Sequence, residues 1–514
     1  MPDATAQPPS SSPHPGPPQG PHPGPHAAAT AAADRLPGAL RRFHPGSVPP
    51  MARANYAKEL LAAICFPFAL VVFEGSVLSV LVRLIYEGRV DDRLLNYASA
   101  FIAVVPALAN VSSFAWVRLS HARDKIRAIT ILNSTMLALV VLLAFMPRNT
   151  AGLIAIAAIA IVARTCWAGF TTLRSTVWKQ NYPDNARARI TGRFGQVGPT
   201  LLAVLSLSLG AAMNAAERLD QHLANIALAF ASFTSPLPDL STLVFRVFVP
   251  VGALIATVAL LSWRRIRVRE RRALSRAEAA SDRASAPSFN PVRLIAVLRK
   301  DRAYDRFMTA QLLLGLGNIM SMSLLAIVLR EVFSVTYFEG LLVSTAITLL
   351  VMPLSIPFWA RLFDRTHILE FRAIHSWIFV VALSILLVAT RLELFWLMVV
   401  FAILKGVAFG GGMLGWTLGH LDFAPKDQVT QYMGVHVTLT GLRGIIAWAF
   451  GVTLYEGLER LQTGAGTWIF TVCILMTLIG ALMFVSQARH LRKRARVERT
   501  GDAPGSGPGE PPGA

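Results

Sequence analysis

Long apolar runs recur from residue 60 to residue 487, and they restrict the possible folds more than any other feature of this sequence. Several of them exceed 18 residues and contain few or no charged side chains. A run of this length is enough for an α-helix to cross the hydrocarbon core of a bilayer. Only 15% of all residues are charged, against about a quarter in ordinary soluble domains. The pattern predicts an all-α, polytopic membrane protein.

Twelve apolar segments can be separated, and a longer polar segment divides them into two sets of six. The cores of the first set are 60–84, 94–117, 127–146, 151–177, 191–213 and 242–263. The cores of the second set are 305–329, 338–359, 372–390, 394–419, 431–454 and 466–487. Residues 215–240 are interrupted by Pro236, Pro238 and Asp239, so we expect an outer loop there.

These segments and the composition between them predict five regions. They are a disordered Pro/Gly/Ala-rich extension (1–50), an N-terminal six-helix bundle (51–263), a basic cytoplasmic linker (264–304), a C-terminal six-helix bundle (305–488) and a cytoplasmic tail (489–514) that is first basic and then Pro/Gly-rich. The composition of the two ends cannot bury a hydrophobic core. We therefore expect the folded part of the chain to lie between them.

The formal net charge is +20, and the positions of the basic residues indicate their role. In a soluble protein this charge would suggest a nucleic-acid partner, but here most Lys and Arg lie in alternate loops, the linker and the tail. The loop residues on this side include Arg118, Arg123, Lys125, Arg127, Lys179, Arg187, Arg189, Arg193, Arg361, Arg365 and Arg372. Because basic loops stay in the cytoplasm, we expect an inner- or plasma-membrane protein with both termini cytoplasmic and no nucleic-acid partner.

The sequence shows no motif for a metal or a nucleotide. Its three cysteines, Cys65, Cys166 and Cys473, lie far apart inside apolar runs, so neither ligand spacing nor a disulfide framework is visible. A phosphate-binding loop, GxxxxGK followed by Ser or Thr, does not occur, which argues against ATP-driven transport by this chain alone. We therefore expect no metal and no cofactor.

Two pairs of similar loops indicate an internal repeat. Trp116 and Trp359 each open a Trp-x-Arg-Leu stretch, after the second and the eighth apolar segment, and they are 243 residues apart. The stretches 183–192 and 425–434 both begin with Pro and end with Gly, at an offset of 242. Two matches at nearly one offset, in equivalent loops, predict duplicated six-helix halves.

Twelve spans, a basic central linker and equivalent loops resemble the major facilitator superfamily of secondary transporters, over about residues 55–490. The 2–3 loop motif of that family runs Gly-x-Leu-Ala-Asp-Arg-x-Gly-Arg-Lys. The second copy here keeps its centre as Leu-Phe-Asp-Arg at 362–365, whereas the first reads Leu-Ser-His-Ala at 119–122. The resemblance implies two pseudo-symmetric bundles that rock around a central cavity, with substrate bound near the bilayer midplane.

The same resemblance implies a role for the charges of these two loops. They would hold one state closed through ion pairs with helix ends of the opposite half. The candidates are Arg118, Asp124, Arg361, Asp364 and Arg365. The alternative is that the basic members act only as positive-inside anchors.

Arg164, Lys405 and Glu74 are charged residues that lie well inside predicted spans. Arg164 of the fourth span lies within one residue of the repeat position of Lys405 in the tenth, and Glu74 lies in the first. A charge at mid-bilayer costs at least about 2.5–3.5 kcal/mol, so each is expected to have a partner or a function. Arg164 could neutralise Glu74 structurally, or bind an anionic substrate together with Lys405. Alternatively, Glu74 could carry a coupling proton under the control of Arg164.

Four further polar residues lie at membrane depth and complete the candidate binding set. They are Gln311 and Asn318 in the seventh span and His436 and Arg443 in the eleventh. His436 and Arg443 are seven residues apart, about two helical turns, so they share one face of a helix. A role in packing is the alternative for the histidine.

These features predict a secondary active transporter, not an enzyme, that moves a small organic solute by alternating access. The buried cations favour an anionic or zwitterionic solute, protons are the expected coupling ion, and a monomer is expected. A polytopic membrane enzyme or lipid scramblase, or a receptor that does not transport, remains the alternative. The expected outer loop offers Glu217, Asp220 and His222, which are too sparse for a convincing catalytic site.

Overall fold

The computed structural model describes residues 41–73, 76–229, 239–280, 297–363, 365–420, 422–424 and 429–500. The chain divides into two units, Met1–Ala57 and Lys58–Ala514. In the first unit, two 3-10 turns, η1 (Pro45–Ser47) and η2 (Pro50–Ala52), lie within or beside the extension that composition predicts to be disordered. The Tyr56 hydroxyl donates a hydrogen bond to the Phe43 carbonyl at 2.9 Å. The second unit contains nearly all of the apolar helices.

The helices before the linker form what we call the N-terminal half. They are α3 (Arg53–Cys65, of which Lys58 onward belongs to the second unit), α4 (Pro67–Leu70), η3 (Val71–Phe73), α5 (Val77–Tyr86), α6 (Asp92–Asn110), α7 (Ser113–Leu119), α8 (Lys125–Leu143), α9 (Thr150–Asn181), α10 (Asp184–Ala229) and α11 (Leu240–Arg264). Side-chain caps fix several starts: Asn149 accepts from the Gly152 N–H at 2.9 Å at the start of α9. A short helix, α12 (Arg271–Ala280), follows in the linker.

The helices after the linker form the C-terminal half. They are α14 (Arg302–Glu331), α15 (Tyr337–Leu341), a π-helical turn η5 (Leu342–Ala346), α16 (Ile347–Phe363), α17 (Ile368–Arg391), α18 (Phe395–Leu418), α19 (Val429–Leu461), η6 (Ala465–Trp468) and α20 (Ile469–Thr500). Asp301 caps α14 through the backbone N–H groups of Ala303 and Tyr304. A reciprocal capping box of Thr336 and Glu339 starts α15.

The prediction of an all-α polytopic membrane protein is confirmed. The described residues contain eleven helices that are long and apolar enough to cross a membrane, whereas the sequence suggested twelve. The difference falls on the predicted span 94–117, which is divided into α6 and α7 after Asn110. Pro106 lies inside α6 and removes one backbone donor, and polar residues such as Asn96 reduce the hydropathy of this helix.

Two other expectations need correction or completion. The expected outer loop at 215–240 is wrong for its first part, because α10 continues as a helix to Ala229. Residues 215–229 are mostly Ala, Leu and other good helix formers, and the prolines that break helices come only later. The first predicted span, 60–84, is a series of shorter helices, and Glu74 in its middle lies outside the described residues.

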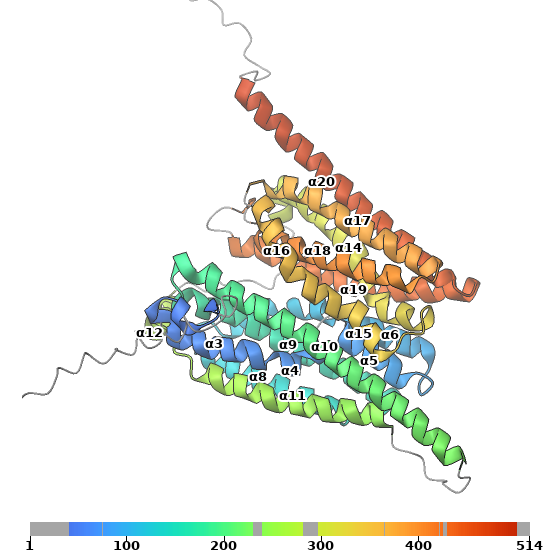
Figure 1. The fold of residues 1–514 in the computed structure, drawn as a ribbon. Helices are drawn as coiled ribbons and strands as arrows, with labels where there is room; N and C mark the ends of the chain where they lie inside the picture. Colours follow the sequence, from blue (N-terminus) through green and yellow to red (C-terminus); the bar gives the residue numbers. More distant parts are fainter. Residues whose placement is uncertain are drawn as a thin grey trace, which may run out of the picture. The chain divides into compact units, whose positions relative to one another are not determined.

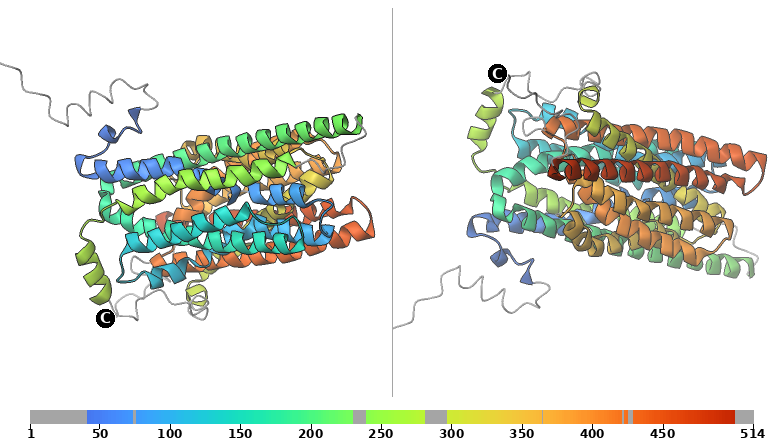
Figure 2. Two further views of the ribbon diagram at one scale, coloured as in Figure 1. Left: turned by 90° about the horizontal axis from the view of Figure 1, so that it is seen from below. Right: turned by 90° about the horizontal axis from the view of Figure 1, so that it is seen from above.

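The helices pack within each half, and fewer of them make contact between the halves. Figure 1 shows α4 and α8 to α11 gathered together, α16 to α20 gathered together, and α15 beside α5. In both views of Figure 2, most of the long helices run in roughly the same direction. Contacts between the halves are made chiefly by α6 with α14 and α19, and by α10 with α15, η5 and α16. These helices therefore border any space that lies between the halves.

The internal repeat is visible as a pair of equivalent hydrogen bonds. The indole N–H of Trp116 donates to the carbonyl of Thr165 in α9 at 3.0 Å. The indole N–H of Trp359 donates to the carbonyl of Val407 in α18 at 2.8 Å. Donors and acceptors are separated by nearly the same number of residues in the two halves. The repeated Trp thus fixes the same helix pair in each half.

One polar cluster, the Glu331 cluster, joins the two halves. The Glu331 carboxylate accepts hydrogen bonds from Arg83 at 3.1 Å, from Asn96 at 3.0 Å and from the Tyr455 hydroxyl at 2.7 Å. Asn96 also donates to Glu456 at 2.7 Å. Arg83 and Asn96 belong to the N-terminal half and the other three residues to the C-terminal half. The cluster therefore holds the halves together near the ends of α5, α14 and α19.

Asp239 fixes the start of α11 and binds two arginines of the N-terminal half. Its carboxylate accepts hydrogen bonds from the Thr242 N–H at 3.0 Å and the Ser241 hydroxyl at 2.7 Å. It is paired with Arg148 and, at 3.3 Å, with Arg89. Burial by itself would raise the pKa of this carboxyl group, but the hydrogen bonds and Arg148 outweigh burial and lower the pKa to about 2.

The stabilisation by ionised Asp239 should be complete above about pH 4 and be lost as pH falls toward 2. Asp239→Asn keeps a good helix cap and removes the charge, so it should lower the melting temperature of the purified protein at pH 7. The difference from wild type should shrink as pH falls from 4 toward 2. Asp239→Ala also removes the cap and should cost about 1 kcal/mol more. Equal melting temperatures of wild type and Asp239→Asn at pH 7 would contradict this assignment.

Candidate functional site

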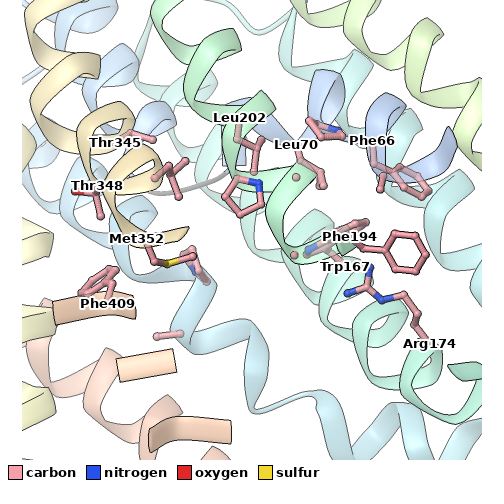
Figure 3. A pocket seen from close by; sticks show the side chains of 18 of the residues that line it. Phe66, Leu70, Trp167, Arg174, Phe194, Leu202, Thr345, Thr348, Met352 and Phe409 are labelled. Carbon is pink, nitrogen blue, oxygen red and sulfur yellow. The ribbon is translucent and has the colours of Figure 1, made fainter. Parts of the chain in front are cut away.

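A cavity of about 550 Å³ lies between the two halves and is lined by helices of both. Its walls are mostly apolar. Figure 3 shows Phe66, Trp167 and Phe194 on one wall and Met352 and Phe409 on the opposite wall. Its volume falls within the range of about 300–1,000 Å³ that is typical of small-molecule sites. We call it the central cavity.

A buried carboxyl group, Glu59 of α3, lines the central cavity beside a cation. Its side chain accepts hydrogen bonds from the Trp178 indole N–H at 2.5 Å and from the Tyr182 hydroxyl at 2.8 Å. Arg174 is close enough for its charge to act on Glu59, and its guanidinium lies 4.4 Å from the ring centroid of Trp178. The Nε atom of Arg174 is buried and has no hydrogen-bond partner. This corner of the cavity therefore combines an acid, a cation and aromatic rings.

The helical repeat explains which residues of α9 reach the cavity. Trp167, Arg174 and Trp178 follow one another at seven and four residues, which places them on one face of the helix. Arg164, the candidate from the sequence, is half-buried in the same helix but is not among the residues that line the cavity. The offset of 242 residues relates Arg164 to Gly406 rather than to Lys405. A shift of one residue rotates a helix position by about 100°, so the two cations face different directions.

Lys405 lies where the sequence places it, in the wall of the central cavity. Its side chain is 2% exposed, and its ammonium group donates a hydrogen bond to the Ser344 carbonyl at 2.9 Å. Ser344 and Thr345 belong to the π-helical turn η5, and both also line the cavity. π-Helical turns are frequent at functional sites. Lys405 thus contributes a second cation, on the wall opposite Arg174.

A second cavity, of about 370 Å³, adjoins the central one and is lined mainly by helices of the C-terminal half. The two share Ile319, Met352 and Phe409 among their lining residues. We call the second one the arginine cavity, because Arg372 of α17 and Arg443 of α19 line it. Its other polar lining residues are Asn110, Gln311, Asn318, Trp416 and Thr440. Three of the candidate residues from the sequence, Gln311, Asn318 and Arg443, thus come together here.

Both guanidinium groups are deeply buried and have only neutral or imidazole partners. Arg443 is 3% exposed and donates to the Gln311 carbonyl at 2.9 Å and the Thr440 hydroxyl at 2.5 Å. Arg372 is 1% exposed and lies 3.3 Å from Nδ1 of His375. The Nε atoms of both arginines lack a hydrogen-bond partner. In the part of the chain that the structure describes, no carboxylate forms an ion pair with either arginine or with Lys405.

His436 is buried behind this cavity. Its ring lies 5.5 Å from that of Trp416, its Nε2 atom has no hydrogen-bond partner, and it is not among the lining residues. No group of three or more His, Cys, Asp or Glu placed to hold a metal occurs within the described ranges. The chemistry available in the two cavities is therefore that of cations, amides, hydroxyls and aromatic rings, with Glu59 as the described acid.

Among the described residues, Arg118, Asp124, Arg361 and Arg365 form no ion pair between the two halves. Arg118, Arg361 and Arg365 are exposed, and Asp124 caps α8 and pairs with Arg271 of the linker at 2.8 Å. Asp364 lies outside the described residues. The gate that these loops were expected to form stays a prediction, and the ion pairs between the halves that the structure describes lie in and near the Glu331 cluster.

The residues that sequence reasoning missed lie close to the ends of predicted spans. Glu59 precedes the span at 60–84, and Arg174 lies near the end of the span at 151–177. Arg372 was assigned to a basic loop, which is wrong: it lies in α17 and is buried. Its spacing of three residues from His375, on one helix face, was the available signal. Charges at predicted span ends are usually interfacial, and only packing shows which of them turn inward.

The comparisons with known proteins agree with this arrangement. No family model and no curated protein matches the sequence. A solved D-xylose–proton symporter matches with 12% identity and a TM-score of 0.61, over 84% of this chain and 96% of that one. A bacterial homologue of the human lysosomal transporter Spinster, in an inward-facing and unoccupied conformation, matches with 15% identity and a TM-score of 0.58, over 87% and 98%. The POT family transporter PepTSo matches with 12% identity and a TM-score of 0.59, over 87% and 99%. The chain therefore has the fold of major facilitator superfamily transporters.

The interaction between Glu59 and Arg174 can be measured with a double-mutant cycle. Glu59→Gln and Arg174→Gln should each lower the free energy of unfolding, because each leaves the other charge without its partner. The double variant should lose less than the sum, with a coupling of about 1 kcal/mol or more. The control pair is Glu59→Gln with Arg391→Gln, an exposed arginine of the other half, for which no coupling is expected. Additive effects in the first cycle would show that the two charges do not interact.

Proposed function

We propose that this chain is a secondary active transporter that moves a small organic anion across the membrane by alternating access. The observation that supports it best is the central cavity: it lies between the two halves of a transporter fold, and helices of both halves line it. Arg174 and Lys405 on its walls, with the adjoining Arg372 and Arg443, favour a negatively charged solute. A substrate bound between the halves would contact both, so their relative movement would expose it to either side.

Protons are the proposed coupling ion, with Glu59 as the acid. This carboxyl group is buried, lines the cavity and lies beside Arg174. A substrate anion that contacts Arg174 would weaken its attraction for Glu59, so that binding of the anion and binding of a proton favour each other. Glu74, the candidate from the sequence, lies outside the described residues and is retained as a second acid to be tested in the same way.

The proposed orientation follows from the basic loops. The linker at 264–304 and both termini would be cytoplasmic, in an inner or plasma membrane, because this side carries most of the Lys and Arg. The Glu331 cluster would then lie toward the outer side. A structure whose halves are joined there would correspond to an inward-facing state.

Flux into proteoliposomes tests the function. We expect wild-type protein to take up a radiolabelled organic anion, chosen from a ligand-stabilisation screen, faster under an imposed pH gradient than without one. Glu59→Gln should abolish the response to the pH gradient while ligand binding persists. Glu370→Gln, a carboxylate that pairs with Arg492 outside the cavities, is the matched control and should transport normally.

Three results would contradict the proposal in different ways. Ligand binding without flux would identify a receptor, and formation of a chemically changed product without flux would identify an enzyme. If the pH gradient does not affect uptake by wild type, transport is not coupled to protons and is facilitated transport instead.

The Glu331 cluster should control the conformational equilibrium. Arg83 also pairs with Asp92 of its own half, so Glu331→Gln removes the carboxylate that ties it to the other half and should shift the protein toward states in which these helix ends separate. Spin labels on cysteines introduced at Arg93 and Gln462, in a background without native cysteines, should report a longer distance in the variant. Glu459→Gln is the control, because Glu459 bonds to Gly464 and Gly466 of its own half. An unchanged distance distribution in Glu331→Gln would show that the cluster does not act as a gate.

A further inference from the structure

The arginine cavity contains two buried cations with which no carboxylate of the described residues forms an ion pair. Arg372 and Arg443 line the same cavity, so two like charges are buried together. The imidazoles of His375 and His436 lie among them, and no described carboxylate is paired with either arginine. Burying a charge without a counter-charge is strongly unfavourable. An arrangement of this kind is expected where the missing negative charge arrives with a ligand.

The backbone around the two arginines leaves room for their guanidinium groups. An ideal Cβ atom at Gly415 of α18 would come within 2.7 Å of an Nη atom of Arg372. A Cβ atom at Gly315 of α14 would collide with Nη1 of Arg443. Two helices thus carry glycine at the points where a side chain would displace a guanidinium. The positions of both guanidinium groups therefore depend on glycine at these two places.

The donor groups of the pair match an oxyanion. A guanidinium presents five N–H donors in a planar fork, which suits the oxygens of a carboxylate, a phosphate or a sulfonate. Arg443 uses two terminal nitrogens on the Gln311 carbonyl and the Thr440 hydroxyl, while Nε of each arginine stays unpaired. Hydrogen bonds between ionised partners are about twice as strong as neutral ones. The pair can therefore hold an anionic group more firmly than it holds its present neutral partners.

The adjoining central cavity is suited to a different part of the same molecule. Its walls carry Phe66, Trp167, Phe194 and Phe409, and Phe409 also borders the arginine cavity. Aromatic walls bind flat or branched apolar groups by burial and stacking. A small inorganic anion would leave these walls without a contact.

We propose that Arg372 and Arg443 bind the oxyanion head group of an amphiphilic organic anion whose aromatic or branched body lies in the central cavity between Trp167 and Phe409. This assignment rests on the proposed function, since it names the substrate class of the same site. It places the head group in the C-terminal half and the body between the halves. Lys405, bonded to the Ser344 carbonyl, borders the path between the two parts.

The test uses 1-naphthyl phosphate as the anionic probe and 1-naphthol as the neutral one, with full-length protein in a non-ionic detergent. The phosphate should raise the melting temperature of wild type and quench its tryptophan fluorescence with saturation. The neutral probe should bind at least tenfold more weakly. Arg372→Gln and Arg443→Gln should each weaken binding of the phosphate by roughly tenfold or more.

Two further measurements separate a binding role from a structural one. If the arginines serve a ligand, the unliganded Arg372→Met variant should melt at or above the temperature of wild type, because it removes an unpaired buried charge. A structural arginine would instead make that variant melt lower. Arg391→Gln, an exposed arginine of the same helix, is the control and should bind the phosphate like wild type. Gly415→Ala should weaken binding of the phosphate by displacing the guanidinium.

The outcomes also separate this proposal from the one on which it rests. Equal affinity of wild type and both Gln variants for 1-naphthyl phosphate would overturn the head-group site, even if another anion is transported. Arginine-dependent binding without flux would support the site and overturn the transporter. Phosphatidic acid in nanodiscs could raise the melting temperature of wild type but not of the two Gln variants, while 1-naphthyl phosphate has no such effect. This result would support the oxyanion site, with a lipid head group as its ligand.

Discussion

The cost of burying charge among apolar helices governs the arrangement of this protein. Most of its helices are apolar enough to lie in a bilayer, where an unpaired ion is unfavourable. The structure nevertheless buries Glu59, Lys405, Arg372 and Arg443. All four line the central or the arginine cavity. The charges that cost most thus lie where the two halves and a bound solute can compensate for them.

The buried charges of the Glu331 cluster and of the arginine cavity are compensated in different ways. In the Glu331 cluster, Arg83 is paired with Glu331 of the other half as well as with Asp92 of its own, so contact between the halves contributes to the compensation. In the arginine cavity, Arg372 and Arg443 have neutral or imidazole partners, so a ligand can supply what the chain does not. In the proposed transport cycle, the first arrangement would hold the two halves together, and the second would leave binding free energy for a solute.

The internal repeat extends to helix packing but not to the buried charges. Trp116 and Trp359 make equivalent bonds to α9 and α18, and the neighbouring Gly169 and Gly411 each leave room for the tryptophan ring. The packing of the two halves is therefore preserved at these positions. The charged residues do not follow the repeat: Glu59 lies in the N-terminal half, and the close arginine pair lies in the C-terminal half. Helix packing requires side chains of the same shape in both halves. In the proposed site, the two ends of the solute would require different binding groups.

The sequence by itself determined the all-α membrane fold, because hydropathy over about twenty residues is a property of each segment alone. It also placed Lys405 and Arg443 at membrane depth. It could not determine which face of each helix turns inward. Arg164 and Lys405 differ by one residue in the repeat, and only packing decided that Lys405 reaches the cavity. Packing likewise turned Arg372, which the sequence places at the edge of a span, into the interior, because contacts between helices far apart in the chain are absent from any local pattern.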